Sequence, residues 1–93
     1  DTAWAMDAKQ NPIEMVEKFA DRLYNVHFKD FTWNADRSHN DVPVGTGNLD
    51  LPALLAAMDK IGFSGITVLE YEGNPENPVP ALKECVAQMK KSM

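Results

Sequence analysis

Apolar residues recur every three or four positions in three stretches of the chain, which is the period of a helix with one buried face. The pattern predicts helices at about residues 12–22, 51–61 and 80–92. Pro12 suits the first position of the first helix, and Gly62 ends the second. The expected buried faces are Ile13, Val16, Phe19, Ala20 and Leu23; then Leu51, Leu54, Leu55, Met58 and Ile61; then Leu82, Cys85, Val86 and Met89.

Short runs of strand-forming residues lie between these helices. Residues 23–29 alternate apolar Val26 and Phe28 with polar neighbours, and residues 65–71 are so rich in β-branched and apolar residues that they predict a strand buried on both faces. Residues 1–4 resemble the end of a further strand. This order of strand end, helix, strand, helix, strand and helix predicts an α/β fold with a parallel sheet and right-handed crossovers.

Residues 31–48 read as a long loop, and loops of this length are usually functional or disordered. Gly45 and Gly47 in its second half are too few for a dinucleotide-binding fingerprint, which needs a third glycine after a strand. The two glycines therefore indicate a tight turn before the next helix.

Composition places the 93 residues in one globular domain, with 44% hydrophobic and 25% charged residues. The net charge of −5 argues against nucleic-acid binding, which depends on clustered Lys and Arg. No apolar run approaches the length of about 18 residues that a membrane helix needs, and no stretch resembles a signal peptide, so we expect a cytoplasmic protein without a membrane partner. Cys85 is the only cysteine, which excludes disulfides within one chain and favours a small buried side chain.

Three metal-competent side chains stand at or just after strand ends: Asp1, His27 and Glu70. The carboxyl ends of parallel strands meet at one edge, so these side chains are expected to converge. Mixed carboxylate and imidazole ligands suit Mn²⁺, Co²⁺, Mg²⁺ or Zn²⁺. Terminal Asp and Glu also serve as caps and ion-pair partners, so spacing alone leaves both interpretations open.

Several short motifs occur in a fixed order along the chain. They are Asp-Thr-Ala-Trp at 1–4, Asp-Arg-Leu at 21–23, Val-His-Phe-Lys-Asp at 26–30, Val-Pro-Val-Gly-Thr-Gly at 42–47 and Leu-Glu-Tyr-Glu-Gly at 69–73. With these motifs the chain resembles the last three βα units of the xylose isomerase-like sugar phosphate isomerase/epimerase superfamily. The resemblance covers essentially all residues and implies that 1–93 form a single partial domain, the C-terminal portion of a (β/α)₈ TIM barrel.

The resemblance also implies residue roles. Asp1, His27 and Glu70 match three of the family's four ligands to one divalent metal ion, and the first Glu would lie upstream. Trp4 departs from the His that many relatives carry beside the Asp. Glu70 is the implied catalytic acid or base, and the implied substrate contacts are Lys29, Arg37, His39 and Glu72.

The implied function is a divalent-metal-dependent isomerase or epimerase of a sugar or sugar phosphate, with proton transfer beside a metal-polarised carbonyl through an enediolate. Three units cannot close a barrel, so activity is expected only with the missing N-terminal barrel portion, and self-association into a homo-oligomer is an alternative partnership. A dehydratase acting on an inositol-derived ketone and a non-catalytic, self-assembling α/β fragment are the alternative functions. An endonuclease of the same barrel type would need more histidines than the two present.

Overall fold

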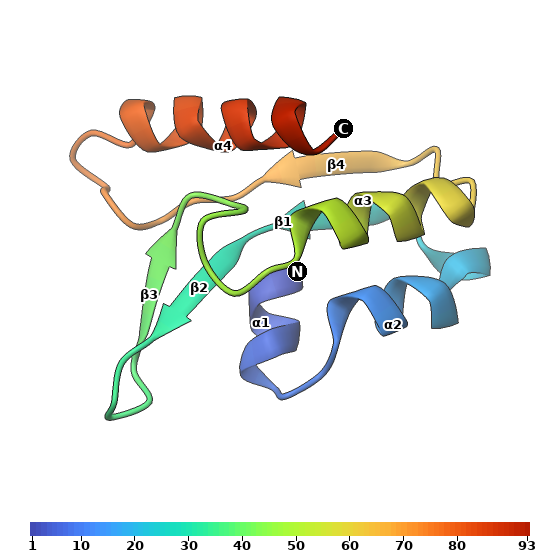
Figure 1. Ribbon diagram of the computed structural model, residues 1–93, viewed down its shortest axis with the longest axis horizontal. Helices are drawn as coiled ribbons and strands as arrows, with labels where there is room; N and C mark the ends of the chain where they lie inside the picture. The colour runs from blue at the N-terminus through green and yellow to red at the C-terminus, as the bar shows by residue number, and fades with distance from the viewer.

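The computed structural model describes all of residues 1–93, which form helices and strands around one parallel strand pair and one antiparallel hairpin (Figure 1). None of the helices combines the length and the apolar composition that a membrane-spanning segment requires. In chain order the elements are α1 (Thr2–Asp7), α2 (Pro12–Lys18), a 3₁₀-helix η1 (Ala20–Arg22), β1 (Asn25–Phe28), β2 (Asp30–Trp33), β3 (His39–Val42), α3 (Leu51–Lys60), β4 (Ile66–Leu69) and α4 (Val79–Ser92).

Strands β1 and β4 form the parallel pair that the sequence predicts, which confirms the α/β fold with a parallel sheet. The register sets Val26 beside Thr67 and Phe28 beside Leu69. Helix α3 packs between α2 and α4, so three helices run alongside this strand pair (Figure 1). The core lies where α2, α3 and α4 meet β1, and it includes Val16, Val26, Phe28, Leu54, Met58 and Cys85.

One face of the strand pair is open, which corrects the expectation that residues 65–71 are buried on both faces. Ile66 is 66% exposed and Val68 38% exposed, because they point away from the helices. Val86, expected on the buried face of α4, is also exposed, whereas Cys85 is buried as predicted. The reason is that two strands offer α4 only a narrow surface on which to pack.

Residues 2–7 form α1, where the sequence suggested a strand end at residues 1–4. The carboxylate of Asp1 accepts a hydrogen bond from the backbone N–H of Trp4 at 3.0 Å, which caps the helix. Ala3 and Ala5 then favour helix over strand.

The region expected to be an irregular loop contains an antiparallel hairpin of β2 and β3. Its register sets Asp30 opposite Val42 and Trp33 opposite His39. The turn is closed by a hydrogen bond from the N–H of Asn34 to the carbonyl of Ser38 at 2.8 Å. The sequence did not indicate this hairpin, because each strand has only four residues and the turn between them is polar.

Asp30 organises the segment that leads from the hairpin to α3. Its carboxylate is fully buried and accepts hydrogen bonds from the backbone N–H groups of Gly45, Gly47 and Leu49 at 2.9 to 3.0 Å. A Cβ atom at Gly47 would lie 2.6 Å from the Asp30 carboxylate, so only glycine fits there. Burial raises the pKa of Asp30 above its usual 3.8, although these hydrogen bonds oppose the rise.

Candidate functional site

Three side chains from distant parts of the chain converge at the carboxyl end of the β1–β4 pair. His27 lies on the open face of β1, Glu70 follows β4 directly, and Asp1 precedes α1. Each offers a ligand atom, and these atoms lie within 4.8 Å of one another. The convergence results from the parallel register, which brings the ends of both strands to one edge.

The donor set fits a divalent metal ion. One imidazole and two carboxylates suit Mn²⁺, Co²⁺, Mg²⁺ or Zn²⁺, and three protein ligands leave positions open for substrate or water. His27 Nδ1 lies 2.8 Å from Glu70 Oε2, so the two share a hydrogen bond that an ion binding both would replace. The Glu70 side chain is 30% exposed and can therefore reach a ligand from solvent.

Lys29 lies beneath this cluster as a buried cation. Its side chain is only 1% exposed, and Nζ lies 2.5 Å from Asp41 Oδ2, 3.1 Å from Glu72 Oε1 and 3.8 Å from Glu70 Oε1. Burial alone lowers the pKa of Lys29, but the hydrogen bonds and charges of Asp41 and Glu72 outweigh it and raise the pKa above 10.5. The hydrogen bond from Lys29 in turn lowers the pKa of Glu72 below 4.5.

Asp41 is a site residue that the sequence did not reveal. One carboxylate oxygen, Oδ2, accepts from Lys29 and from the backbone N–H of Glu72 at 3.1 Å. The other, Oδ1, is buried without a hydrogen-bond partner. Asp41 belongs to β3, in the stretch that reads as a loop, and only the strand alternation of the hairpin could have indicated it.

An open hollow of about 400 Å³ adjoins the buried lysine. Its wall is aromatic: the His39 ring stacks on Phe31 with centroids 4.1 Å apart, and Trp4 meets His39 edge-on at 5.2 Å. The hollow is lined by Trp4, Lys29, Phe31, His39, Asn40, Asp41, Glu72 and Gly73. Three of the four expected substrate contacts are therefore brought together, next to the metal-competent cluster.

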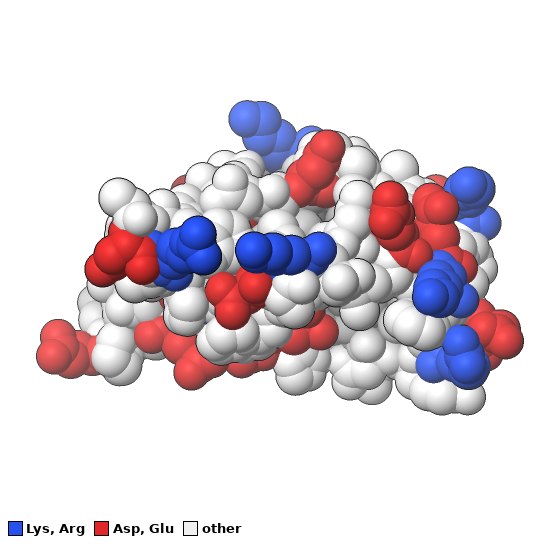
Figure 2. Space-filling view, turned by 90° about the horizontal axis from the view of Figure 1, so that it is seen from below, with Lys and Arg blue, Asp and Glu red and all other residues white.

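Arg37 is not brought to this hollow. It occupies the turn between β2 and β3 with a positive φ of 71° and lines a different hollow with Lys9, Asp7 and Trp33. On the face seen from below, Lys and Arg side chains are interspersed with Asp and Glu (Figure 2).

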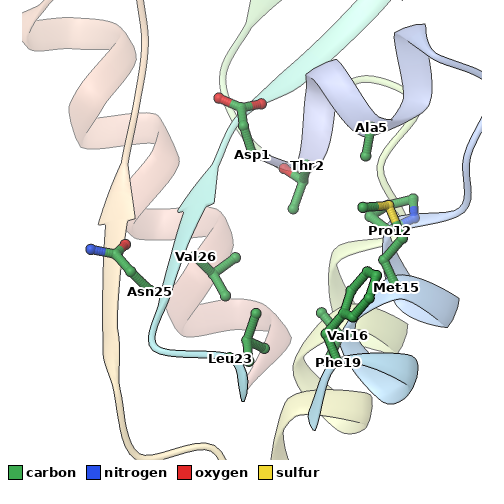
Figure 3. A pocket seen from close by; sticks show the side chains of 10 residues that line it. All are labelled: Asp1, Thr2, Ala5, Pro12, Met15, Val16, Phe19, Leu23, Asn25 and Val26. Carbon is green, nitrogen blue, oxygen red and sulfur yellow. The ribbon is translucent and has the colours of Figure 1, made fainter. Parts of the chain in front are cut away.

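An apolar groove runs along β1 on the side away from β4, bordered by α1 and α2. Figure 3 shows Val26, Met15, Val16 and Phe19 along it, with Asp1 at one end. The hydroxyl of Thr2 donates a hydrogen bond to the carbonyl of Lys29 at 2.6 Å and accepts one from the backbone N–H of Lys29 at 3.0 Å. The backbone of Lys29 is therefore hydrogen-bonded at the strand edge beside the metal-competent cluster. The rest of this edge faces the groove.

Comparison with known proteins identifies the family. Individually curated proteins gave no match. A family profile described as xylose isomerase-like TIM barrel matches residues 1–91, nearly the whole chain. The match agrees with the parallel strand pair, at whose carboxyl end the three metal-competent side chains converge. The chain belongs to the xylose isomerase-like TIM barrel family.

Proposed function

We propose that this chain forms the C-terminal part of a divalent-metal-dependent sugar isomerase or epimerase. The observation that carries the proposal is the convergence of Asp1, His27 and Glu70, whose ligand atoms lie within 4.8 Å of one another at the carboxyl end of the β1–β4 pair. A bound divalent ion would supply a Lewis acid for a substrate carbonyl. The family match supports the sugar-processing class, and the donor chemistry supports the metal.

Glu70 is the proposed acid or base for proton transfer at the carbon beside the carbonyl. It is reachable from solvent, and Lys29 Nζ lies 3.8 Å from its Oε1. Its second oxygen lies 2.8 Å from His27 Nδ1, and an ion bound by both residues would hold that oxygen in place of the hydrogen bond. Glu70 is thus oriented from two sides, as a proton-transfer group must be.

Two side chains of the hollow are assigned to substrate binding. His39 and Glu72 are proposed to contact substrate hydroxyls, because both line the hollow and Glu72 is 68% exposed. Lys29 lines it too, but its ammonium already bonds two carboxylates, so we assign it to holding Glu72 and Glu70 in place. Arg37 is not included because it lies in the hairpin turn.

A closed barrel of eight βα units is typically about 250 residues long, so this activity is proposed for a larger assembly. The two-stranded parallel sheet has free edges, and the edge of β1 borders the apolar groove in Figure 3. A neighbouring barrel strand could pair there. The isolated 93 residues are expected to show little turnover.

Metal titration of the isolated chain tests the ligand set. Isothermal titration with Mn²⁺ is expected to show that His27→Ala and Glu70→Ala each weaken binding at least about tenfold, which is about 1.4 kcal/mol. Asp1→Asn keeps a helix cap but should also weaken binding, because it removes a charged ligand. Glu76→Ala, at an exposed carboxylate outside the cluster, is the matched control and should bind as the parent does. Equal affinity in all five proteins would refute the metal centre.

A further inference from the structure

A second hollow, of about 420 Å³, lies between the C-terminal end of α1 and the turn of the β2–β3 hairpin, which are on the same side of the molecule (Figure 1). It shares no lining residue with the aromatic hollow beside Lys29 or with the metal-competent cluster. Two cations and one carboxylate line it, so its net charge is +1 in a chain of net charge −5. The lining residues are Met6, Asp7, Lys9, Trp33, Asn34 and Arg37. This local excess of positive charge favours an anionic ligand.

Both cations lie at backbone positions that glycine usually occupies. Lys9, with a φ of 59°, and Arg37, with a φ of 71°, are the two non-glycine residues of the chain in the left-handed region. Lys9 ends α1: its N–H donates to the carbonyl of Met6 at 2.9 Å, and the next N–H, of Gln10, donates to the carbonyl of Ala5 at 2.9 Å. This pair of hydrogen bonds is the Schellman arrangement, in which the left-handed residue is usually glycine.

Arg37 occupies a similar position in the hairpin turn. Its N–H donates to the carbonyl of Asn34 at 3.0 Å, and the N–H of Asn34 donates to the carbonyl of Ser38 at 2.8 Å. The turn is therefore a three-residue hairpin loop whose last residue is left-handed, again a position that favours glycine. Glycine would adopt both conformations with less strain than Lys9 and Arg37 do. The chain thus carries a cation at two strained positions, and both cations line one hollow.

The two cations are available to a ligand. Both side chains are exposed, and neither takes part in the ion pairs of the chain. The carboxylate of Asp7 accepts a hydrogen bond from the indole N–H of Trp33 at 3.1 Å. The carboxylate of Asp36, beside Arg37, accepts from the backbone N–H of Ser38 at 3.0 Å and from its hydroxyl at 2.6 Å. The neighbouring acidic groups are therefore held by other donors.

Trp33 gives the hollow an apolar wall. The hydrogen bond to Asp7 fixes the position of the indole, and Phe31 meets the indole edge-on with ring centroids 5.9 Å apart. Met6 adds a thioether, which packs well against aromatic rings. A flat apolar group can lie against these side chains, while an Arg fork and a Lys ammonium are the groups that bind phosphate. The volume is within the range of small-molecule sites.

We infer that this hollow is an accessory binding site for a phosphate monoester with an aromatic body. Arg37 and Lys9 bind the phosphate, and Trp33 and Met6 contact the ring. Two positive charges match the charge of nearly −2 that a phosphate monoester carries at pH 7. The inference is independent of the proposed function, because no residue of the metal-competent cluster takes part.

Titration of the full 93-residue chain with phenyl phosphate tests the site, with EDTA present so that no metal ion can bind the phosphate. NMR follows the two indole N–H resonances. The resonance of Trp33 is expected to shift, and that of Trp4, in the aromatic hollow, is expected to stay unchanged. Inorganic phosphate and phenol each lack one part of the ligand, so each should bind at least about tenfold more weakly than phenyl phosphate.

Arg37→Gly and Lys9→Gly separate binding from folding. Each removes a cation from a position that favours glycine, so the urea midpoint should not fall. The affinity for phenyl phosphate should fall at least about tenfold in each variant. Lys83→Ala, which removes an exposed lysine on α4, is the matched control and should bind as the parent does. His27→Ala should also bind as the parent does, because it changes only the metal-competent cluster.

Three results would overturn the inference: no shift of the Trp33 resonance at tens of millimolar phenyl phosphate, binding of inorganic phosphate or phenol as tight as that of phenyl phosphate, or parent-like affinity in folded Arg37→Gly and Lys9→Gly. An equal loss of affinity in Lys83→Ala would also overturn it, because binding would then follow total charge. A loss in His27→Ala would assign the phosphate to the proposed metal centre instead.

Discussion

Lys29 and Asp41 form a buried ion pair with Nζ 2.5 Å from Oδ2. The pair joins the segment after β1 to strand β3, and Glu72 Oε1 at 3.1 Å from the same ammonium joins both to the segment after β4. One cation thus connects three parts of the chain that meet at the candidate site. Its removal should affect both stability and the position of Glu70.

Lys29→Met is predicted to lower the free energy of unfolding by about 3 kcal/mol, because it leaves the buried carboxylate of Asp41 unpaired. Urea denaturation followed by far-UV circular dichroism measures this. Asp41→Asn should cost less when added to Lys29→Met than by itself, since the two residues interact directly. Strictly additive losses would show that the ion pair contributes no coupling.

Asp30→Asn is predicted to destabilise the protein by about 2 kcal/mol, because a charged acceptor for three backbone N–H groups is replaced by a neutral amide. The loss of stability should be greatest in the segment that Asp30 holds by these hydrogen bonds. Hydrogen exchange at the amides of Gly45, Gly47 and Leu49 is expected to accelerate more than exchange in the core of α3. Asp59→Asn, an exposed change on α3, is the control and should leave these rates unaltered.

Stability should depend on pH on both sides of neutrality. The pKa of Lys29 is raised above 10.5, so its contribution is present below that pH and is lost as pH rises through the folded-state value. The pKa of Glu72 is lowered from 4.5, so its contribution is present above pH 4.5 and is lost as pH falls through the lower folded-state value.

The substitution Glu72→Gln isolates the contribution of Glu72 to the loss of stability at acidic pH. The difference in urea midpoint between the parent and Glu72→Gln should be constant near neutral pH and should shrink as the solution becomes more acidic than pH 4.5. A difference that does not change with pH would mean that the Lys29–Glu72 contact adds nothing to stability.

Leu54→Ala tests the placement of the core. Leu54 is fully buried on α3, and its truncation is predicted to cost about 3 kcal/mol in the free energy of unfolding. Val86→Ala removes an apolar side chain that is 42% exposed on α4, and it should change stability by no more than about 0.5 kcal/mol. Similar losses of stability from Leu54→Ala and Val86→Ala would mean that α4 is buried more deeply than the structure shows.

Local periodicity was sufficient for the elements with long, regular patterns. The apolar spacing of α3 and the proline at the first position of α2 are local features, and they lie where the sequence placed them. The parallel pairing of β1 and β4 also followed from the alternation of strands and helices. Contacts between neighbours in sequence encode these features, so reading the chain in order recovers them.

The sequence misled where a local pattern was short. The hairpin of β2 and β3 has four residues in each strand, and a polar turn separates them. Helix α1 is six residues long and depends on the cap supplied by Asp1. Elements of this size gain most of their stability from tertiary contacts, so their own residues indicate them weakly.

By itself, then, the sequence determined the α/β class, the parallel strands and the candidates His27 and Glu70 near strand ends, because the strand period fixes which residues reach one edge of a sheet. Asp1 was also a candidate, but the structure places it at the cap of α1. Only the tertiary structure brought Asp41 and Glu72 to Lys29, opened the aromatic hollow and placed Arg37 outside it. The contact between Lys29 and Glu72 alone joins residues 43 positions apart. Their geometry depends on how β1, the hairpin and β4 pack together, and no short stretch of the sequence indicates that packing.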